Sequence, residues 1–152
     1  MNKLFVILIT FFLSYGCSYK PILSVKEYDF KFTNIYFDEK SKINNLIRNK
    51  LIKNSKKSSE EEYDLSFSTI KNKEVVSSNK KGDPTIFKIE ILLNYSLKRD
   101  GEIILNDKIR KQVTYNNIND KFELLKYEEN VLNDILENII SEVLMSVTYF
   151  NK

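Results

Sequence analysis

The chain has 152 residues, a formal net charge of +3, a single Cys and no His. This length allows one domain with one modest core, and 24 basic against 21 acidic residues give no electrostatic argument for a nucleic-acid partner. The absence of His excludes imidazole bases, His-based triads and His-ligated metal sites, and one Cys cannot form an internal disulfide. We therefore expect a protein that is not an enzyme and carries neither a cofactor nor a metal.

The amino terminus has the organisation of a secretory signal peptide. Lys3 supplies one positive charge, and residues 4–13 are apolar apart from one Thr. This stretch is too short for a membrane-spanning helix, which needs about twenty residues. We predict a signal peptide over residues 1–16, with an uncleaved anchor as the alternative.

The Cys of this chain directly follows the apolar stretch and a small residue. Gly16 before Cys17 resembles the end of a bacterial lipobox, in which the Cys receives a diacylglyceryl group and becomes the new, acylated amino terminus. Ser14 departs from that pattern, which has Leu three positions before the Cys. We predict lipidation of Cys17, a tether over residues 17–26 and, because Ser18 follows the Cys, sorting to the outer membrane. An ordinary signal peptide with an incidental Cys is the alternative.

The next part of the chain predicts a strand and then a helix. Residues 28–37 begin with alternating apolar and polar side chains, which is typical of a half-buried strand. Asp38 or Ser41 can cap a helix over residues 42–53. The apolar face of this helix consists of Ile43, Leu46, Ile47 and Leu51.

Three further alternating segments predict three long strands. They cover residues 63–76, 87–97 and 103–115, and a segment rich in turn residues separates the first two. Asp100-Gly101 lies between the last two and is a favoured pair for a two-residue hairpin turn, because both positions need a positive φ.

A last helix completes the predicted fold. It begins after Asn119 or Asp120, ends near Val147, and carries a broad apolar stripe that can lie across a sheet. The order β-α-β-β-β-α predicts one α+β domain over residues 27–152. In this domain, two helices pack on one face of a four-stranded, largely antiparallel sheet. The opposite face is polar and would be solvated or meet a polar partner.

Five short motifs occur in an order and spacing that match a known family. They are Cys17-Ser18-Tyr19-Lys20-Pro21, Leu46-Ile47-Arg48-Asn49-Lys50-Leu51, Tyr63-Asp64-Leu65, Tyr95-Ser96-Leu97 and Thr114-Tyr115-Asn116. Over nearly its whole mature length the chain resembles short, divergent members of the lipopolysaccharide-assembly lipoprotein family, LptE. The resemblance implies a lipid-anchored outer-membrane protein on the periplasmic side or inside a barrel lumen. Such a protein plugs the β-barrel LptD, assists its assembly and binds lipopolysaccharide on its way to the outer leaflet.

Basic residues near the strand connections are the candidates for contact with lipopolysaccharide. Its phosphates and acidic sugars call for Lys or Arg side chains. The candidates, chosen by charge and position, are Lys71, Lys73, Lys80, Lys81, Lys98 and Arg99. The alternative is that they are ordinary solvated residues of a Lys-rich protein.

Two other functions remain open from the sequence. One is a lipoprotein subunit of another envelope lipid-trafficking or ABC-type transport complex, which its partner would identify. The other is a lipoprotein enzyme that uses an acidic pair, such as Asp83 with Glu90 or Glu128 with Glu129. Adjacent helical residues such as Glu128 and Glu129 point about 100° apart, so that pair cannot act on one substrate atom.

Overall fold

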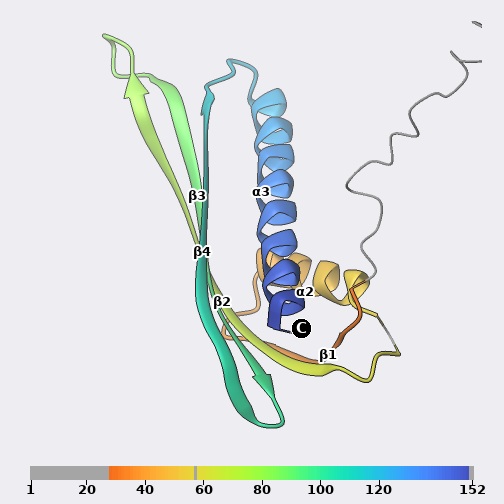
Figure 1. Cartoon of the computed structure of the whole chain (residues 1–152). Coiled ribbons are helices and arrows are strands. Elements are labelled where there is room, and N and C mark those ends of the chain that lie inside the picture. The colour runs from red at the N-terminus through yellow and green to blue at the C-terminus, as the bar shows by residue number, and fades with distance from the viewer. Residues whose placement is uncertain (1–27, 57, 151–152) are drawn as a thin grey trace, which may run out of the picture.

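Figure 1 shows the computed structural model of the chain, which describes residues 28–56 and 58–150. The elements follow in the order β1 (Lys31–Phe37), α2 (Lys42–Asn54), β2 (Glu62–Ser78), β3 (Pro84–Arg99), β4 (Glu102–Asn116) and α3 (Lys121–Phe150). This order confirms the sequence prediction. The predicted signal peptide, Cys17 and the tether lie outside the described residues.

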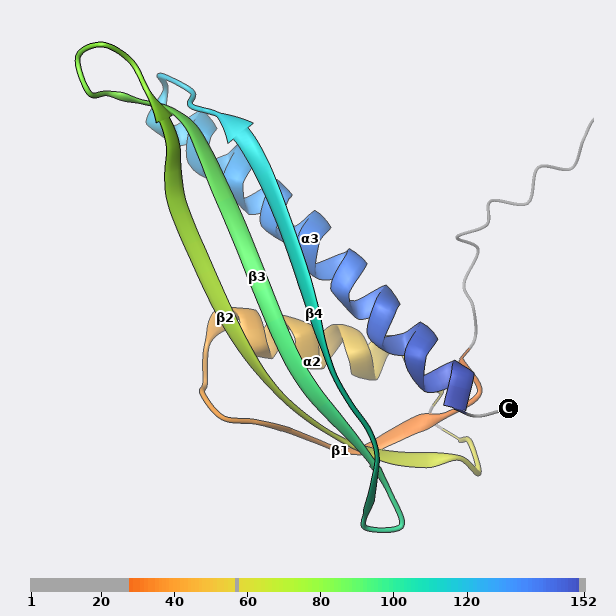
Figure 2. The same cartoon turned by 60° about the vertical axis from the view of Figure 1, so that its left-hand side comes forward.

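The four strands form one mixed sheet in the order β1-β2-β3-β4. β1 is parallel to β2, whereas β2 pairs with β3, and β3 with β4, in antiparallel orientation. The parallel pair follows from the connection, because α2 returns the chain to the end of the sheet where β1 began. Both helices cover the same face of the sheet (Figures 1 and 2), which confirms the predicted α+β architecture.

The β3–β4 hairpin is built as the Asp100-Gly101 pair predicts. The φ angles are +53° at Asp100 and +83° at Gly101, so both central residues are left-handed, as a type I′ turn requires. Alternate residues of β3 face the helices and are buried. They are Ile89, Ile91, Leu93, Tyr95 and Leu97.

The apolar stripe of α3 is broad because this helix packs on two partners. One side lies against the sheet, and α2 covers a second side with two interhelical ion pairs, Lys42–Glu129 at 3.1 Å and Lys50–Glu137. Leu136 lies seven residues after Glu129 and is therefore on the same side of α3. Its side chain is completely buried.

A buried polar contact fixes the start of α2 against the sheet. Ser41 caps the helix and accepts a hydrogen bond from the Asn44 backbone N–H group at 3.1 Å. The buried Asn44 side chain donates to the Glu39 carbonyl group at 2.8 Å and accepts from the Thr69 hydroxyl group. The start of α2 is therefore held beside the middle of β2.

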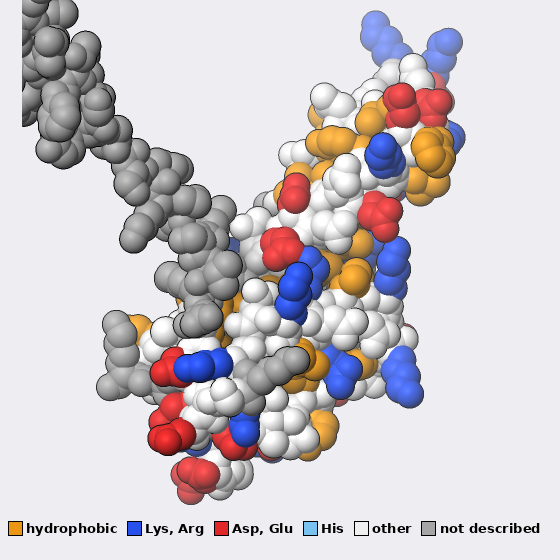
Figure 3. Space-filling model, turned by 90° about the vertical axis from the view of Figure 1, so that its right-hand side faces the viewer, with side chains coloured by type: hydrophobic (Ala, Val, Ile, Leu, Met, Phe, Trp, Pro, Cys, Tyr) orange, Lys and Arg blue, Asp and Glu red, His pale blue; other side chains and the backbone are white. Residues whose placement is uncertain are grey.

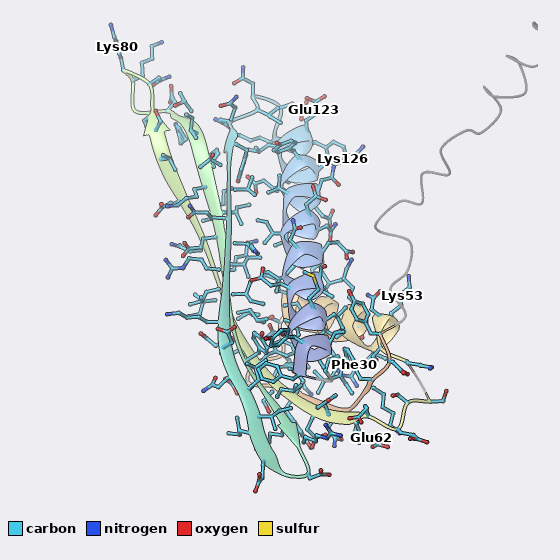
Figure 4. All side chains as sticks on the ribbon, in the orientation of Figure 1. Phe30, Lys53, Glu62, Lys80, Glu123 and Lys126 are labelled. Carbon is cyan, nitrogen blue, oxygen red and sulfur yellow. The ribbon has the colours of Figure 1, made fainter. Side chains whose placement is uncertain are left out.

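The elongated molecule has two different ends (Figures 1 and 2). We call the turn at residues 79–83, the end of β4 and the start of α3 the distal end. We call the turn at residues 100–101 the proximal end. β1 and the end of α3 lie in the half of the molecule nearer this turn. Tyr28, the first described residue, pairs with Ser55 after α2, and Phe30 lies near the end of α3 (Figure 4). The predicted tether would therefore join the domain toward the proximal end.

Candidate binding site

The predicted basic residues do not form one cluster. Lys80 and Lys81 lie in the turn at the distal end, whereas Lys98 and Arg99 lie beside the turn at the proximal end (Figure 4). β3 joins these ends, and its 16 residues span about 50 Å at roughly 3.3 Å each. One ligand head group therefore cannot contact both pairs.

The distal turn presents Lys80 and Lys81 on a well-ordered tip. The Asn79 side-chain oxygen accepts hydrogen bonds from the backbone N–H groups of Lys81 at 2.8 Å and Asp83 at 3.0 Å. The Asn79 amide group donates to the Asp83 carboxylate at 3.0 Å, and Gly82 takes a φ of +88°. Asp83 is thus engaged within the turn. Among the described residues, neither exposed lysine forms an ion pair.

Lys73 is engaged in a partly buried network between β2, β4 and α3. Its ammonium group lies 2.6 Å from a Glu128 carboxylate oxygen and 4.6 Å from the centre of the Phe87 ring. The Tyr115 hydroxyl group donates to the same Glu128 oxygen at 2.8 Å. Burial raises the pKa of Glu128, but the hydrogen bonds from Lys73 and Tyr115 outweigh it and hold this pKa below its ordinary value. The pKa of Tyr115 is raised mainly by burial and further by the Glu128 carboxylate.

We expect Glu128→Gln to lower the free energy of unfolding by about 1–3 kcal/mol at neutral pH, because Lys73 loses its charged partner. The folded pKa of Glu128 lies below 4.5. Its stabilising contribution is therefore complete above that pH and is lost as the pH falls through the folded value. Urea unfolding of both proteins should show a stability difference that narrows from pH 7 toward about pH 3. Glu102→Gln, at an exposed position, is the control, and an equal difference at both pH values would contradict the role of the carboxylate.

Lys71 and the proximal pair have different surroundings. Lys71 is exposed on the helix-facing side of β2 and, within the described residues, forms no ion pair. Arg99 pairs with Glu61 at 2.6 Å and lies over the Tyr63 ring, 5.7 Å from its centre. Lys98 lies directly opposite Asp64 on the neighbouring strand. The proximal cations therefore have acidic neighbours, whereas the distal lysines remain free to bind an anion.

Exposed apolar side chains also occur at the distal end, at the start of α3. The sequence analysis did not identify them. Phe122 and Leu125, in the first turns of α3, are 77% and 66% exposed. Figure 3 shows hydrophobic and basic side chains at this end, and Figure 4 shows that Lys80, at the tip of the β2–β3 turn, stands apart from Glu123 at the start of α3. The signal that could have revealed them is their phase, because both residues lie off the buried stripe that begins at Leu124.

The described residues contain no group of three or more Cys, Asp or Glu side chains that could hold a metal ion. None of the helices in residues 28–56 and 58–150 is long and apolar enough to cross a bilayer. Within the described residues, the distal end carries two cations without an ion pair in its turn and exposed apolar side chains at the start of α3, and it is thus the candidate binding site.

The sequence matches no family model and no curated protein, but solved structures match the fold. Rare lipoprotein B from Shewanella oneidensis aligns over 78% of this chain and 96% of its own, with a TM-score of 0.59 and 13% identity. This chain has the fold of rare lipoprotein B. An uncharacterized lipoprotein B from Nitrosomonas europaea aligns over 83% of this chain and 89% of its own (TM-score 0.63, 14% identity). A minor lipoprotein from Acinetobacter baumannii aligns over 82% of this chain and 93% of its own (TM-score 0.57, 8% identity).

Rare lipoprotein B belongs to the LptE family, so these matches confirm the resemblance at the level of the fold. They cover most of both chains, and the match to rare lipoprotein B therefore concerns the whole domain rather than one motif. At such low identity, the shared fold by itself assigns neither a partner nor a ligand to this chain.

Proposed function

We propose that this chain is a lipid-anchored outer-membrane protein that plugs an LptD-type β-barrel, assists its assembly and takes part in lipopolysaccharide transport. The observation that carries the proposal is the fold shared with rare lipoprotein B over 96% of that protein. The lipobox-like sequence that ends at Cys17 supports the lipid anchor.

The surface of the sheet that faces away from the helices suits a position inside a barrel. The lumen of such a barrel is polar, and this sheet surface carries cross-strand ion pairs between Glu74 and Lys88 and between Glu90 and Arg110, the latter at 3.8 Å. Four charged groups of this surface are thus paired within the domain itself. A plug with this surface can contact a polar wall without leaving many charges unpaired.

The distal end is the site that we assign to lipopolysaccharide. Lys80 and Lys81 can bind phosphate oxygens through charge-assisted hydrogen bonds, and Phe122 and Leu125 offer exposed apolar surface to acyl chains. Arg99 at the proximal end is a weaker candidate because Glu61 already neutralises its charge. The combination of free cations and apolar side chains at one end favours an amphipathic, anionic ligand.

We expect the double substitution Lys80→Glu and Lys81→Glu to weaken lipopolysaccharide binding by roughly tenfold or more, because two charge-assisted contacts become repulsive. Binding can be measured by titrating purified full-length protein in detergent with labelled lipopolysaccharide. Both positions are exposed in a turn, so the free energy of unfolding should change little.

The matched control reverses the same number of charges outside the distal end, at the exposed residues Lys40 and Lys53. This variant should bind lipopolysaccharide as the unmodified protein does. Equal binding by the unmodified protein and the Lys80/Lys81 variant would remove the distal lysines from the site.

A further inference from the structure

Within residues 28–56 and 58–150, the distal part of β2 has no neighbouring strand on its outer side (Figure 2). β1 pairs with residues 62–67 of β2, but β2 continues to Ser78. The start of α2 reaches this edge at Thr69, where Asn44 accepts a hydrogen bond from the hydroxyl group. Beyond that point, no strand in the described part of the chain pairs with the outer side of β2. We call residues 70–76 the open edge.

Although Lys73 reaches Glu128 of α3, the side chains of the open edge are exposed on both faces of the sheet. All of its residues are exposed, and three of them are large and apolar: Ile70 at 59%, Val75 at 49% and Val76 at 52%. The other two strands at the sheet edges, β4 and β1, each have one large exposed hydrophobic residue, Ile103 beside the turn and Tyr36. An exposed strand edge with apolar side chains is a template for the addition of another strand.

The charges of the open edge specify what kind of strand could be added. Lys73 is paired with Glu128, and Glu74 is paired with Lys88. Lys71 lies on the same face as Lys73, because side chains two positions apart in a strand point to the same side. Among the described residues Lys71 forms no ion pair, although its charge also acts on Glu128. An added strand would therefore gain most from an acidic side chain opposite Lys71.

A second copy of this chain fits the open edge poorly. Two copies could pair their open edges as antiparallel strands related by a two-fold axis perpendicular to the sheet. When residues 70–76 of the two copies overlap completely, Lys73 of one copy lies directly opposite Lys73 of the other. The next register in one direction places Lys71 of each copy opposite Lys73 of the other. The next register in the other direction places the Glu74 residues of the two copies opposite each other. Like charges directly opposite each other destabilise a strand pair, so a different protein is favoured over a copy.

We propose that the open edge receives an extended strand of a partner protein, with an acidic side chain facing Lys71 and apolar side chains packing on Ile70 and Val76. The added strand would lie on the same side of β2 as β1 does, but alongside residues 70–76, toward the distal end. This interaction goes beyond the proposed function and does not depend on lipopolysaccharide binding at the distal end.

The test uses purified full-length protein in detergent and two synthetic peptides of roughly eight residues, the length of an ordinary strand. Both peptides alternate Val and Thr, and one carries Glu where the other carries Lys on the same face. With free Glu peptide at about ten times its dissociation constant, amide hydrogen exchange over residues 70–76 should slow roughly tenfold. The Lys peptide should leave this exchange unchanged. Sedimentation should show a monomer at the same protein concentration.

Two variants separate the charge of the open edge from a general effect. Lys71→Glu should reverse the preference, so that the Lys peptide protects residues 70–76. Lys108→Glu, at an exposed position on the other sheet edge, should leave the preference unchanged. Equal protection by both peptides, protection along β4 instead, no protection at all, or a dimer formed through residues 70–76 would overturn the proposal.

Discussion

Phe30→Ala is expected to lower the free energy of unfolding by about 3–5 kcal/mol. Phe30 has no exposed surface. Its ring makes edge-to-face contacts, with 5.3 Å between its centre and that of the Phe32 ring and 6.0 Å to the centre of the Tyr63 ring. The Phe30 carbonyl group also accepts a hydrogen bond from the Lys56 backbone N–H group at 2.9 Å. Loss of the ring would leave a cavity where β1, β2 and the end of α2 meet. Small domains are stable by roughly 5–15 kcal/mol, so this change removes a large part of the total.

The matched control is Phe122→Ala, which makes the same chemical change at a side chain that is 77% exposed. It should change the free energy of unfolding by no more than about 0.5 kcal/mol. Urea unfolding followed by circular dichroism measures both variants, since the chain has no Trp. Similar losses from the two substitutions would show that Phe30 is not a core residue.

Cys17→Ser is expected to move the protein from the membrane fraction to the soluble periplasmic fraction. Each buried CH₂ of an acyl chain contributes roughly 0.8 kcal/mol, so two or three chains hold a domain firmly on a bilayer. Without the thiol, no diacylglyceryl group can be attached. Fractionation of cells that produce either protein measures the change, and mass spectrometry of the amino-terminal peptide detects the acyl groups directly.

The control for this experiment is Ser18→Ala, which leaves Cys17 in place and should keep the protein in the membrane fraction. If the Cys17→Ser variant still sediments with membranes in a detergent-free, high-salt wash, the acyl anchor is not what holds the protein. The apolar residues 4–13 or a tightly bound partner would then be the anchor.

Local features of the fold could be predicted because short-range physics decides them. The Asp100-Gly101 pair selects its turn through backbone sterics alone. Ser41 caps α2 as predicted, and α3 begins after Asp120, one of the two predicted starts. Asp120 caps α3, because its carboxylate accepts hydrogen bonds from the backbone N–H groups of Phe122 at 2.8 Å and Glu123 at 3.0 Å. Element boundaries were less exact, since helix and strand ends depend on neighbouring elements. β1, for example, begins at Lys31 rather than at residue 28.

The candidate site could be predicted only in part, because its electrostatics depend on contacts between distant residues. Nothing in the local sequence distinguishes Lys73, which pairs with a glutamate 55 residues away, from Lys71, which does not pair. The separation of Lys80 from Arg99 depends on the length and direction of β3. These are properties of the assembled fold rather than of any one segment.

The most direct test of the proposed function is affinity purification of the tagged full-length protein from detergent-solubilised envelopes, with identification of the proteins that accompany it. A plug of an LptD-type barrel should bring down one large outer-membrane β-barrel in about equal amount. Recovery of inner-membrane transport subunits in place of a barrel would contradict the plug function. It would instead favour a lipoprotein subunit of another envelope transport complex.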